Sequence, residues 1–200
     1  MKPKDAQKYC DLMLEAKHRT SVIRSLLNKE ASLGYLPVNV EAIYLQFRKT
    51  LELIAFGSLI ANREMYSRAR KKYASDWNAK MVLKLAETLN PLFYPVPIKQ
   101  VPVQGEEHVS DFQEVVDGFL TRSDFEVLYD VCGGVLHSEN PYGNTKKYDQ
   151  LWARSPEWLM KIVNLLNSHQ VHPVGEKRSF YLIQMGSTDN PTFTLFEQKK

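Results

Sequence analysis

Apolar residues recur every three or four positions over several long stretches of this chain, which is the spacing of one buried helical face. In the middle of the second stretch, residues 51–61, nearly every position is apolar, as in the central helix of a bundle. Asn39 is expected to cap that second helix, and Ser123 with Glu126 to form a capping box on the fourth. The pattern predicts helices over residues 5–29, 39–73, 78–89 and 123–137, and a fifth that begins at Ser155-Pro156-Glu157.

The segments between and after these helices have other patterns. Residues 90–102 contain four prolines and are expected to be extended, and residues 111–120 to form a weak helix or a turn. Residues 179–185 and 192–197 are rich in aromatic and β-branched residues on either side of a polar loop, which predicts a hairpin. The predicted fold is mainly α: a helical bundle of about five helices over residues 1–172, with a C-terminal β-hairpin over residues 173–200 packed on it.

Composition narrows the class of protein. Two hundred residues suffice for one domain, and no window of about 18 apolar residues predicts a membrane span. The N-terminus lacks the apolar segment of a secretory signal. Cys10 and Cys132 fall among apolar helical positions, so they are expected to be buried thiols of a reducing compartment, which predicts a cytoplasmic protein. A net charge of +3 does not by itself indicate nucleic-acid binding.

The fourth predicted helix carries an unusual polar stripe. Asp130 and His137 lie seven residues apart, close to two helical turns, and Asn140 follows in the turn that ends the helix. Between them stand Gly133 and Gly134, each of which costs a helix about 1 kcal/mol relative to alanine. Two glycines inside a helix can be explained either by tight packing of another helix or by close approach of a ligand.

A carboxylate also stands inside the apolar run of the second helix. Glu52 needs a partner there, because an unpaired ionised group is costly to bury, and Arg48 lies one turn earlier. The pair either fixes packing or lines a cleft. His137 and Arg63 are other partners that folding could bring to Glu52.

Cations gather where the second helix is expected to end, beside Tyr66 and Tyr73. They could bind phosphates while the tyrosines stack on bases, or they could be solvated cations at a helix C-terminus. The candidate nucleic-acid-binding residues are Arg63, Arg68, Arg70, Lys71 and Lys72.

Metal and cofactor motifs are weak. His169 and His172 are three residues apart with no third ligand nearby. The sequence has no glycine-rich phosphate loop and no paired CxxC motif, so we predict no metal and no cofactor.

Two segments carry a family resemblance: RKTLELIAF, residues 48–56, and CGGVLHSENP, residues 132–141. Together they resemble the HEPN superfamily, over a core of about residues 39–169. The family consists of small helical bundles, often dimeric, found in bacterial toxin–antitoxin and phage-defence systems, and many members are ribonucleases. The resemblance matches His137 to the family's histidine. The family places an arginine four to six residues before that histidine, and no arginine stands there, so Arg48 or a partner chain would supply it.

Two functions are therefore expected. The first is a HEPN-like protein of bacterial or phage defence or toxin–antitoxin type that cleaves RNA without a metal, as a homodimer. The alternative is a non-enzymatic binding or regulatory module that contacts a protein partner through the same cleft and the hairpin. An enzyme should bring His137, Arg48 and Glu52 together in an open cleft, and a binding module should bury His137 and expose an apolar patch near the hairpin. The candidate catalytic residues are His137, Arg48, Glu52, Asp130 and Asn140.

Overall fold

A computed structural model describes residues 1–69, 78–102, 110–143, 145–175, 179–186 and 189–197. Six helices and five strands lie in these ranges, so the mainly α prediction is confirmed. The helices are α1 (Pro3–Leu27), α2 (Leu36–Ala61), α3 (Arg63–Ala69), α4 (Ala79–Leu89), α5 (Arg122–Leu136) and α6 (Tyr148–Leu166). The strands are β1 (Val96–Pro102), β2 (Ser110–Glu114), β3 (Ser168–Val171), β4 (Ser179–Gln184) and β5 (Thr192–Glu197).

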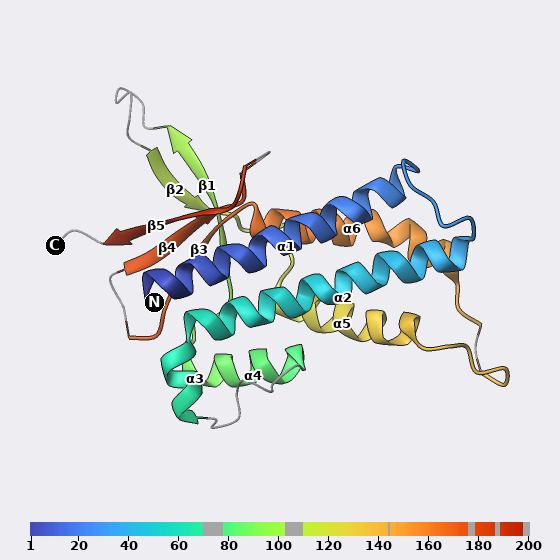
Figure 1. Cartoon of the computed structure of the whole chain (residues 1–200), viewed down its shortest axis with the longest axis horizontal. Helices are drawn as coiled ribbons and strands as arrows, with labels where there is room; N and C mark the ends of the chain where they lie inside the picture. Colours follow the sequence, from blue (N-terminus) through green and yellow to red (C-terminus); the bar gives the residue numbers. More distant parts are fainter. Residues whose placement is uncertain (70–77, 103–109, 144, 176–178, 187–188, 198–200) are drawn as a thin grey trace.

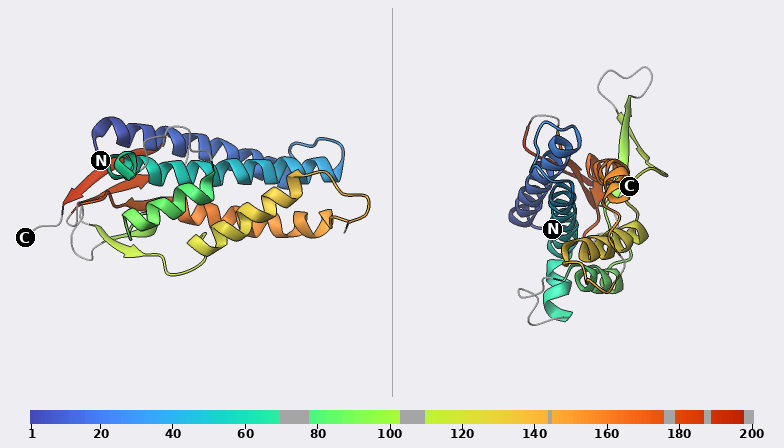
Figure 2. Two further views of the ribbon diagram at one scale, coloured as in Figure 1. Left: turned by 90° about the horizontal axis from the view of Figure 1, so that it is seen from below. Right: turned by 90° about the vertical axis from the view of Figure 1, so that its right-hand side faces the viewer.

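Four long helices form an elongated bundle with the sheet at one end (Figure 1). α1, α2, α5 and α6 lie lengthwise beside one another, and the shorter α4 packs along α2 (Figure 2). α3 follows directly after the end of α2 and contacts α4. None of the described helices is long and apolar enough to cross a membrane. Cys10 and Cys132 are buried free thiols, as predicted. Fully buried apolar side chains fill the space between the helices, among them Met13, Ile43, Phe47, Leu51, Phe125 and Ile162.

Several helix ends differ from the prediction. α2 begins three residues before Asn39, because Pro37 already fixes a helical φ in its first turn. The Asn39 side chain instead accepts the N–H of Leu33 at 2.8 Å. α2 also ends at Ala61 and does not continue to residue 73. Asn62 is its C-cap residue and donates its side-chain amide to the carbonyl of Ser58.

The capping box of α5 consists of other residues than Ser123 and Glu126. Thr121 is the N-cap: its hydroxyl accepts the N–H of Asp124 at 3.0 Å, and the Asp124 carboxylate accepts the N–H of Thr121. Both pairs have the spacing of three that a capping box requires, and the box that formed starts two residues earlier. Glu126 instead forms an ion pair with Arg122, one turn before it.

The predicted start of the last helix at Ser155 is wrong. α6 begins seven residues earlier, at Tyr148, and Pro156 lies inside it. The Ser155 hydroxyl donates to the carbonyl of Leu151 at 2.8 Å, a bond within the helix and not a cap. Apolar contacts of the first two turns with the bundle core therefore outweigh the helix-stop signal of the proline.

The sheet is larger than the predicted C-terminal hairpin. Its five antiparallel strands have the order β2-β1-β3-β4-β5, so the proline-rich segment forms an inner strand. Residues 111–114, at the start of the segment expected as a weak helix or a turn, belong to β2 instead. Phe112 of β2 meets Phe196 of β5 with ring centroids 5.1 Å apart, and Phe180 stacks on Phe196. Because β2 and β5 are at opposite ends of the strand order, this contact indicates that the sheet is strongly curled.

A buried polar contact joins the sheet to the bundle. The Tyr9 hydroxyl of α1 lies 2.9 Å from Nε2 of His169 in β3, and the His169 Nδ1 lies 2.9 Å from the carbonyl of Leu166. A carbonyl only accepts, so Nδ1 carries the proton and Nε2 accepts from Tyr9. Burial lowers the pKa of His169 to about 4 and raises the pKa of Tyr9, which keeps both groups neutral.

Candidate functional site

The Arg48 side chain extends from α2 toward α5, and its predicted pair with Glu52 is present. The Arg48 Nε is 3.5 Å from the Glu52 carboxylate, and Lys49 binds its other oxygen at 2.9 Å. On the α5 side, the Arg48 guanidinium donates to the Tyr129 hydroxyl at 2.9 Å and lies 4.3 Å from the centre of its ring. The Glu52 side chain is 14% exposed and receives two cations, which offset the loss of its hydration. The contact of Arg48 with Tyr129 connects α2 with α5, whereas the two ion pairs of Glu52 lie within α2.

The two glycines of α5 have different surroundings. A Cβ on Gly133 would lie 3.6 Å from Nη1 of Arg48, an ordinary van der Waals contact. A Cβ on Gly134 would meet nothing within 4 Å. Tight packing of a neighbouring helix therefore does not explain Gly134, and the space above it is open to solvent or to a ligand.

Asp130 belongs to a different surface of α5. Lys80 of α4 donates to both of its carboxylate oxygens, at 2.8 and 2.9 Å. The carboxylate is largely exposed, and its bonds tie α4 to α5. Asp130 therefore pairs with α4 and has no hydrogen bond to the other candidate catalytic residues in the described part of the chain.

His137 is the C-cap residue of α5 and is exposed. Its carbonyl oxygen accepts a hydrogen bond from the Lys146 ammonium, which also donates to the carbonyl of Val135. Asn140 shapes the turn that follows, since its side-chain oxygen accepts the N–H of Tyr142 at 3.0 Å. Within the described ranges, no hydrogen bond or ion pair joins the His137 imidazole to Arg48, Glu52 or Asp130. The expected cluster is thus assembled only in part.

A groove between α5 and α6 adjoins His137. Its cavity volume is about 360 Å³, and Gly134 forms part of its floor. Three of the lining side chains are cations and none is a carboxylate, although the nearby Glu139 accepts the backbone N–H of Lys146. Lys146 connects this groove with His137 through its bonds to the end of α5. The α5–α6 groove is lined by Val131, Gly134, Val135, Lys146, Lys147, Gln150, Leu151 and Arg154.

The sequence contains a signal for this groove that our sequence-based prediction did not use. Lys146, Lys147 and Arg154 lie within nine residues, which contain one acidic residue, Asp149. We expected the last helix to begin at Ser155, and that expectation left Arg154 outside any helix. Once Tyr148 begins α6, Arg154 falls two turns into the helix and lines the groove.

The predicted nucleic-acid cluster is described only at its first two cations. Arg63 begins the short helix α3 and forms an ion pair with Asp5 of α1 at 2.9 Å. Arg68 lies in the last turn of α3 and is exposed. Tyr66 is buried, so its ring is not free to stack on a base. Arg70, Lys71 and Lys72, with Tyr73, lie outside the described residues.

Neither histidine of the weak metal motif faces a metal-like set of ligands. His169 is bonded to Tyr9 and to a backbone carbonyl, and His172 Nε2 lies 3.1 Å from the side-chain oxygen of Gln170. Partial burial lowers the pKa of His172. In the portion of the chain that the structure describes, no group of three or more histidine, cysteine or acidic side chains could hold a metal ion.

Comparison with known proteins gives no family or fold assignment: no family model, no curated protein sequence and no solved structure matches this chain.

Proposed function

We propose that this chain is a HEPN-like RNA-binding module of bacterial or phage defence or toxin–antitoxin type, with RNA bound in the α5–α6 groove and cleaved with the help of His137. The observation that carries this proposal is the set of cations in that groove beside an exposed histidine. Such a protein acts on cytoplasmic RNA. The family part of the proposal rests on the sequence resemblance alone, whose two segments lie in α2 and at the end of α5.

The groove is suited to a phosphate backbone because its charge has one sign. Lys147 and Arg154 are exposed and line the groove, and Lys146 adds a third cation at the end nearest His137. Lysine and arginine side chains that neutralise phosphates release condensed counterions, which supplies most of the affinity for nucleic acid. The open space above Gly134 lets a ribose or a phosphate approach the backbone of α5.

His137 supplies the group that moves a proton. An imidazole near neutral pH can accept the proton of a ribose 2′-hydroxyl. The 2′-oxygen then attacks the adjacent phosphorus, a 2′,3′-cyclic phosphate forms, and the bond from phosphorus to the 5′-oxygen breaks. The imidazolium returns its proton to that leaving oxygen, so the reaction consumes no co-reactant.

Arg48 and Glu52 have a supporting role in this proposal. Glu52 pairs with Arg48 within α2, and the bond from Arg48 to the Tyr129 hydroxyl holds α5 against α2. That bond helps to fix the position of the helix end that carries His137. A homodimer, which the resemblance implies, would bring a second set of cations to the RNA.

RNA binding is tested with a fluorescent single-stranded RNA and a Lys147→Ala/Arg154→Ala variant. Losing two phosphate contacts should reduce the slope of log K against log salt by about 1.4, since each contact contributes about 0.7 for single strands. A Lys84→Ala/Lys99→Ala variant removes two exposed cations elsewhere and should keep the wild-type slope. Equal slopes for the two variants would remove the α5–α6 groove from RNA binding.

Cleavage is tested with the same RNA, without added metal, using His137→Ala. We expect loss of cleavage, partial rescue by added imidazole, and a 2′,3′-cyclic phosphate product. Tyr142→Ala, an exposed change in the same turn, should retain cleavage. If His137→Ala cleaves as well as wild type, the histidine has no catalytic role. If wild-type protein binds RNA and neither protein cleaves it, the non-enzymatic binding module is the better description.

A further inference from the structure

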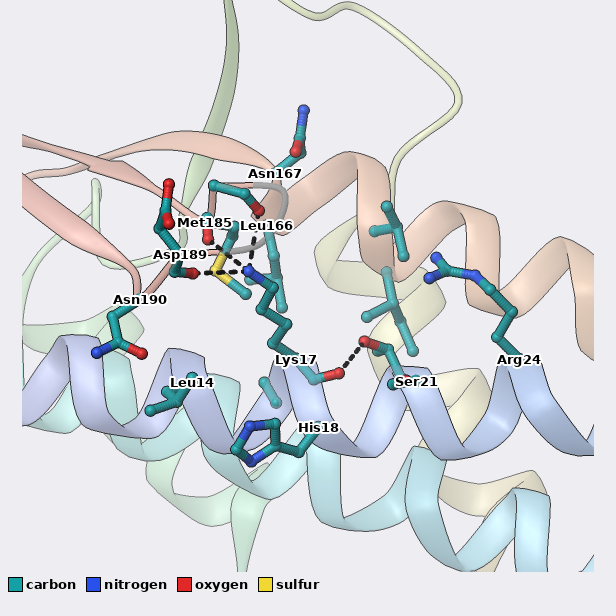
Figure 3. Close-up of a pocket in the computed structure, with 15 residues that line it drawn as sticks. Leu14, Lys17, His18, Ser21, Arg24, Leu166, Asn167, Met185, Asp189 and Asn190 are labelled. Carbon is teal, nitrogen blue, oxygen red and sulfur yellow. Dashed lines mark hydrogen bonds between the residues drawn. The ribbon is translucent and has the colours of Figure 1, made fainter.

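α1 and α6 leave a long groove on the side of the bundle away from the α5–α6 groove. At the end near the sheet, the space between α1, α6 and the turn after β4 has a volume of about 560 Å³ (Figure 3). A second cavity of about 440 Å³ continues along the same helices to Trp152. Arg24 and Val163 line both cavities, so the two form one continuous α1–α6 groove.

The two walls of the α1–α6 groove have different chemistry. On the α6 side the lining residues are apolar and recur at spacings of three and four, which places them on one helical face. Met160 on this wall is 59% exposed. The α6 wall consists of Trp152, Pro156, Leu159, Met160, Ile162, Val163 and Leu166, with Asn167 just beyond the helix end. The α1 wall is mainly polar and consists of Leu14, Ala16, Lys17, His18, Thr20, Ser21, Arg24, Leu27 and Asn28.

The charge of the groove centres on Arg24. Lys17 is already engaged, because its ammonium donates to the carbonyls of Met185, Gly186 and Asp189 and so closes the groove at the sheet end. Arg24 extends from α1 toward α6 in Figure 3 and is exposed, and in the described ranges its guanidinium has no hydrogen bond or ion pair. The one carboxylate among the lining residues is Asp189, at the closed end.

We propose that the α1–α6 groove binds a helical segment of a protein partner that has an apolar stripe on one side and acidic residues beside it. The apolar stripe packs on the α6 wall, and the carboxylates face Arg24, whose charge is otherwise uncompensated. The lining residues of α1 run from Leu14 to Asn28, about 21 Å at 1.5 Å per residue, which matches a helix of about 14 residues. That length, and walls made of two helices side by side, favour a helix over a small ligand.

The class of partner is tested first with a displayed library of random 16-residue peptides selected on the wild-type protein. Peptides that also bind an unrelated protein are discarded, so that the selection does not presuppose where on this protein they bind. The retained peptides should share apolar residues at three- and four-residue spacing flanked by aspartate or glutamate. Retention of basic peptides, of peptides without this spacing, or of none overturns the proposal.

Binding of one retained peptide is then measured by fluorescence anisotropy. Met160→Glu should weaken it at least tenfold, whereas Met81→Glu, a methionine on α4 with the same 59% exposure, should not. Arg24→Glu should weaken the acidic peptide and strengthen a version in which its acids are replaced by lysine. Thermal melting confirms that each variant is folded. Equal affinity for Met160→Glu and Met81→Glu, the same affinity for acidic and lysine peptides, or displacement of the peptide by RNA would each refute the proposed site.

Discussion

Gly57, in the last two turns of α2, is the position at which adding a single methyl group should destabilise the fold most. It faces Tyr9 across the contact of α1 with α2, and a Cβ there would lie 2.8 Å from Cε2 of the Tyr9 ring and 3.3 Å from its Cζ. Real Cβ contacts are almost never that short, so the ring or the helices must shift. The ring is 1% exposed and its hydroxyl donates to the buried His169, so the ring cannot turn away without breaking that bond.

The magnitude of the Gly57→Ala effect follows from opposing contributions. Alanine gains about 1 kcal/mol of helix propensity. Overpacking a well-filled core costs about 1–3 kcal/mol, and leaving the Tyr9–His169 pair unbonded costs about 1–3 kcal/mol more. We expect a net loss of about 2 kcal/mol, which lowers the melting temperature by about 4–8 °C for a chain of this size.

Gly134→Ala is the matched control, since it makes the same change in another helix with nothing within 4 Å. It should stabilise the protein by about 0.5 kcal/mol. This gain is smaller than that expected for a glycine-to-alanine change in the interior of a helix, because α5 ends two residues later. Thermal and urea unfolding followed by circular dichroism measure both variants. In a Tyr9→Phe background, where the ring is no longer held by His169, Gly57→Ala should cost less than in wild type. A Gly57→Ala protein as stable as wild type would refute the reasoning.

Two further predictions concern groups that burial keeps neutral. Because the folded-state pKa of His169 is about 4 and its ordinary value is 6.5, the unfolded chain takes up a proton below pH 6.5 that the folded chain does not. The free energy of unfolding should therefore fall by about 2 kcal/mol between pH 7 and pH 5. His172, whose pKa is also lowered by burial, adds a smaller decrease of the same sign. Urea unfolding at a series of pH values measures this decrease. Flat stability over that range would show that His169 is not buried as described. Burial raises the pKa of the Cys10 thiol to about 11 and that of the Cys132 thiol to about 12. Neither thiol should therefore react with a thiol reagent at pH 8 until urea unfolds the protein. Rapid labelling of the native protein would contradict their burial.

Local spacing predicted those parts of the fold whose stabilising contacts are local. The helices α1, α4 and α5 and the β4–β5 hairpin follow from periodicity within single segments. The Arg48–Glu52 pair follows from i,i+4 geometry in the same way. β1 and β2 could not be predicted so, because a proline-rich segment forms an inner strand only when β3, some seventy residues later, pairs with it. The close approach of Gly57 to Tyr9 also depends on how two helices cross, which no single segment specifies.

The true start of α6 explains why neither the α5–α6 groove nor the α1–α6 groove was predicted from the sequence. A serine, a proline and a glutamate at residues 155–157 have the order of a helix start, and that local signal left residues 148–154 outside the predicted helix. In the structure these residues form the first two turns of α6, and their side chains point to two different surfaces. Leu151 and Arg154 line the α5–α6 groove, while Trp152 lines the α1–α6 groove. A prediction that this helix begins at Tyr148 would have placed Arg154 and Trp152 on separate faces of one helix. Both proposed binding sites depend on that placement.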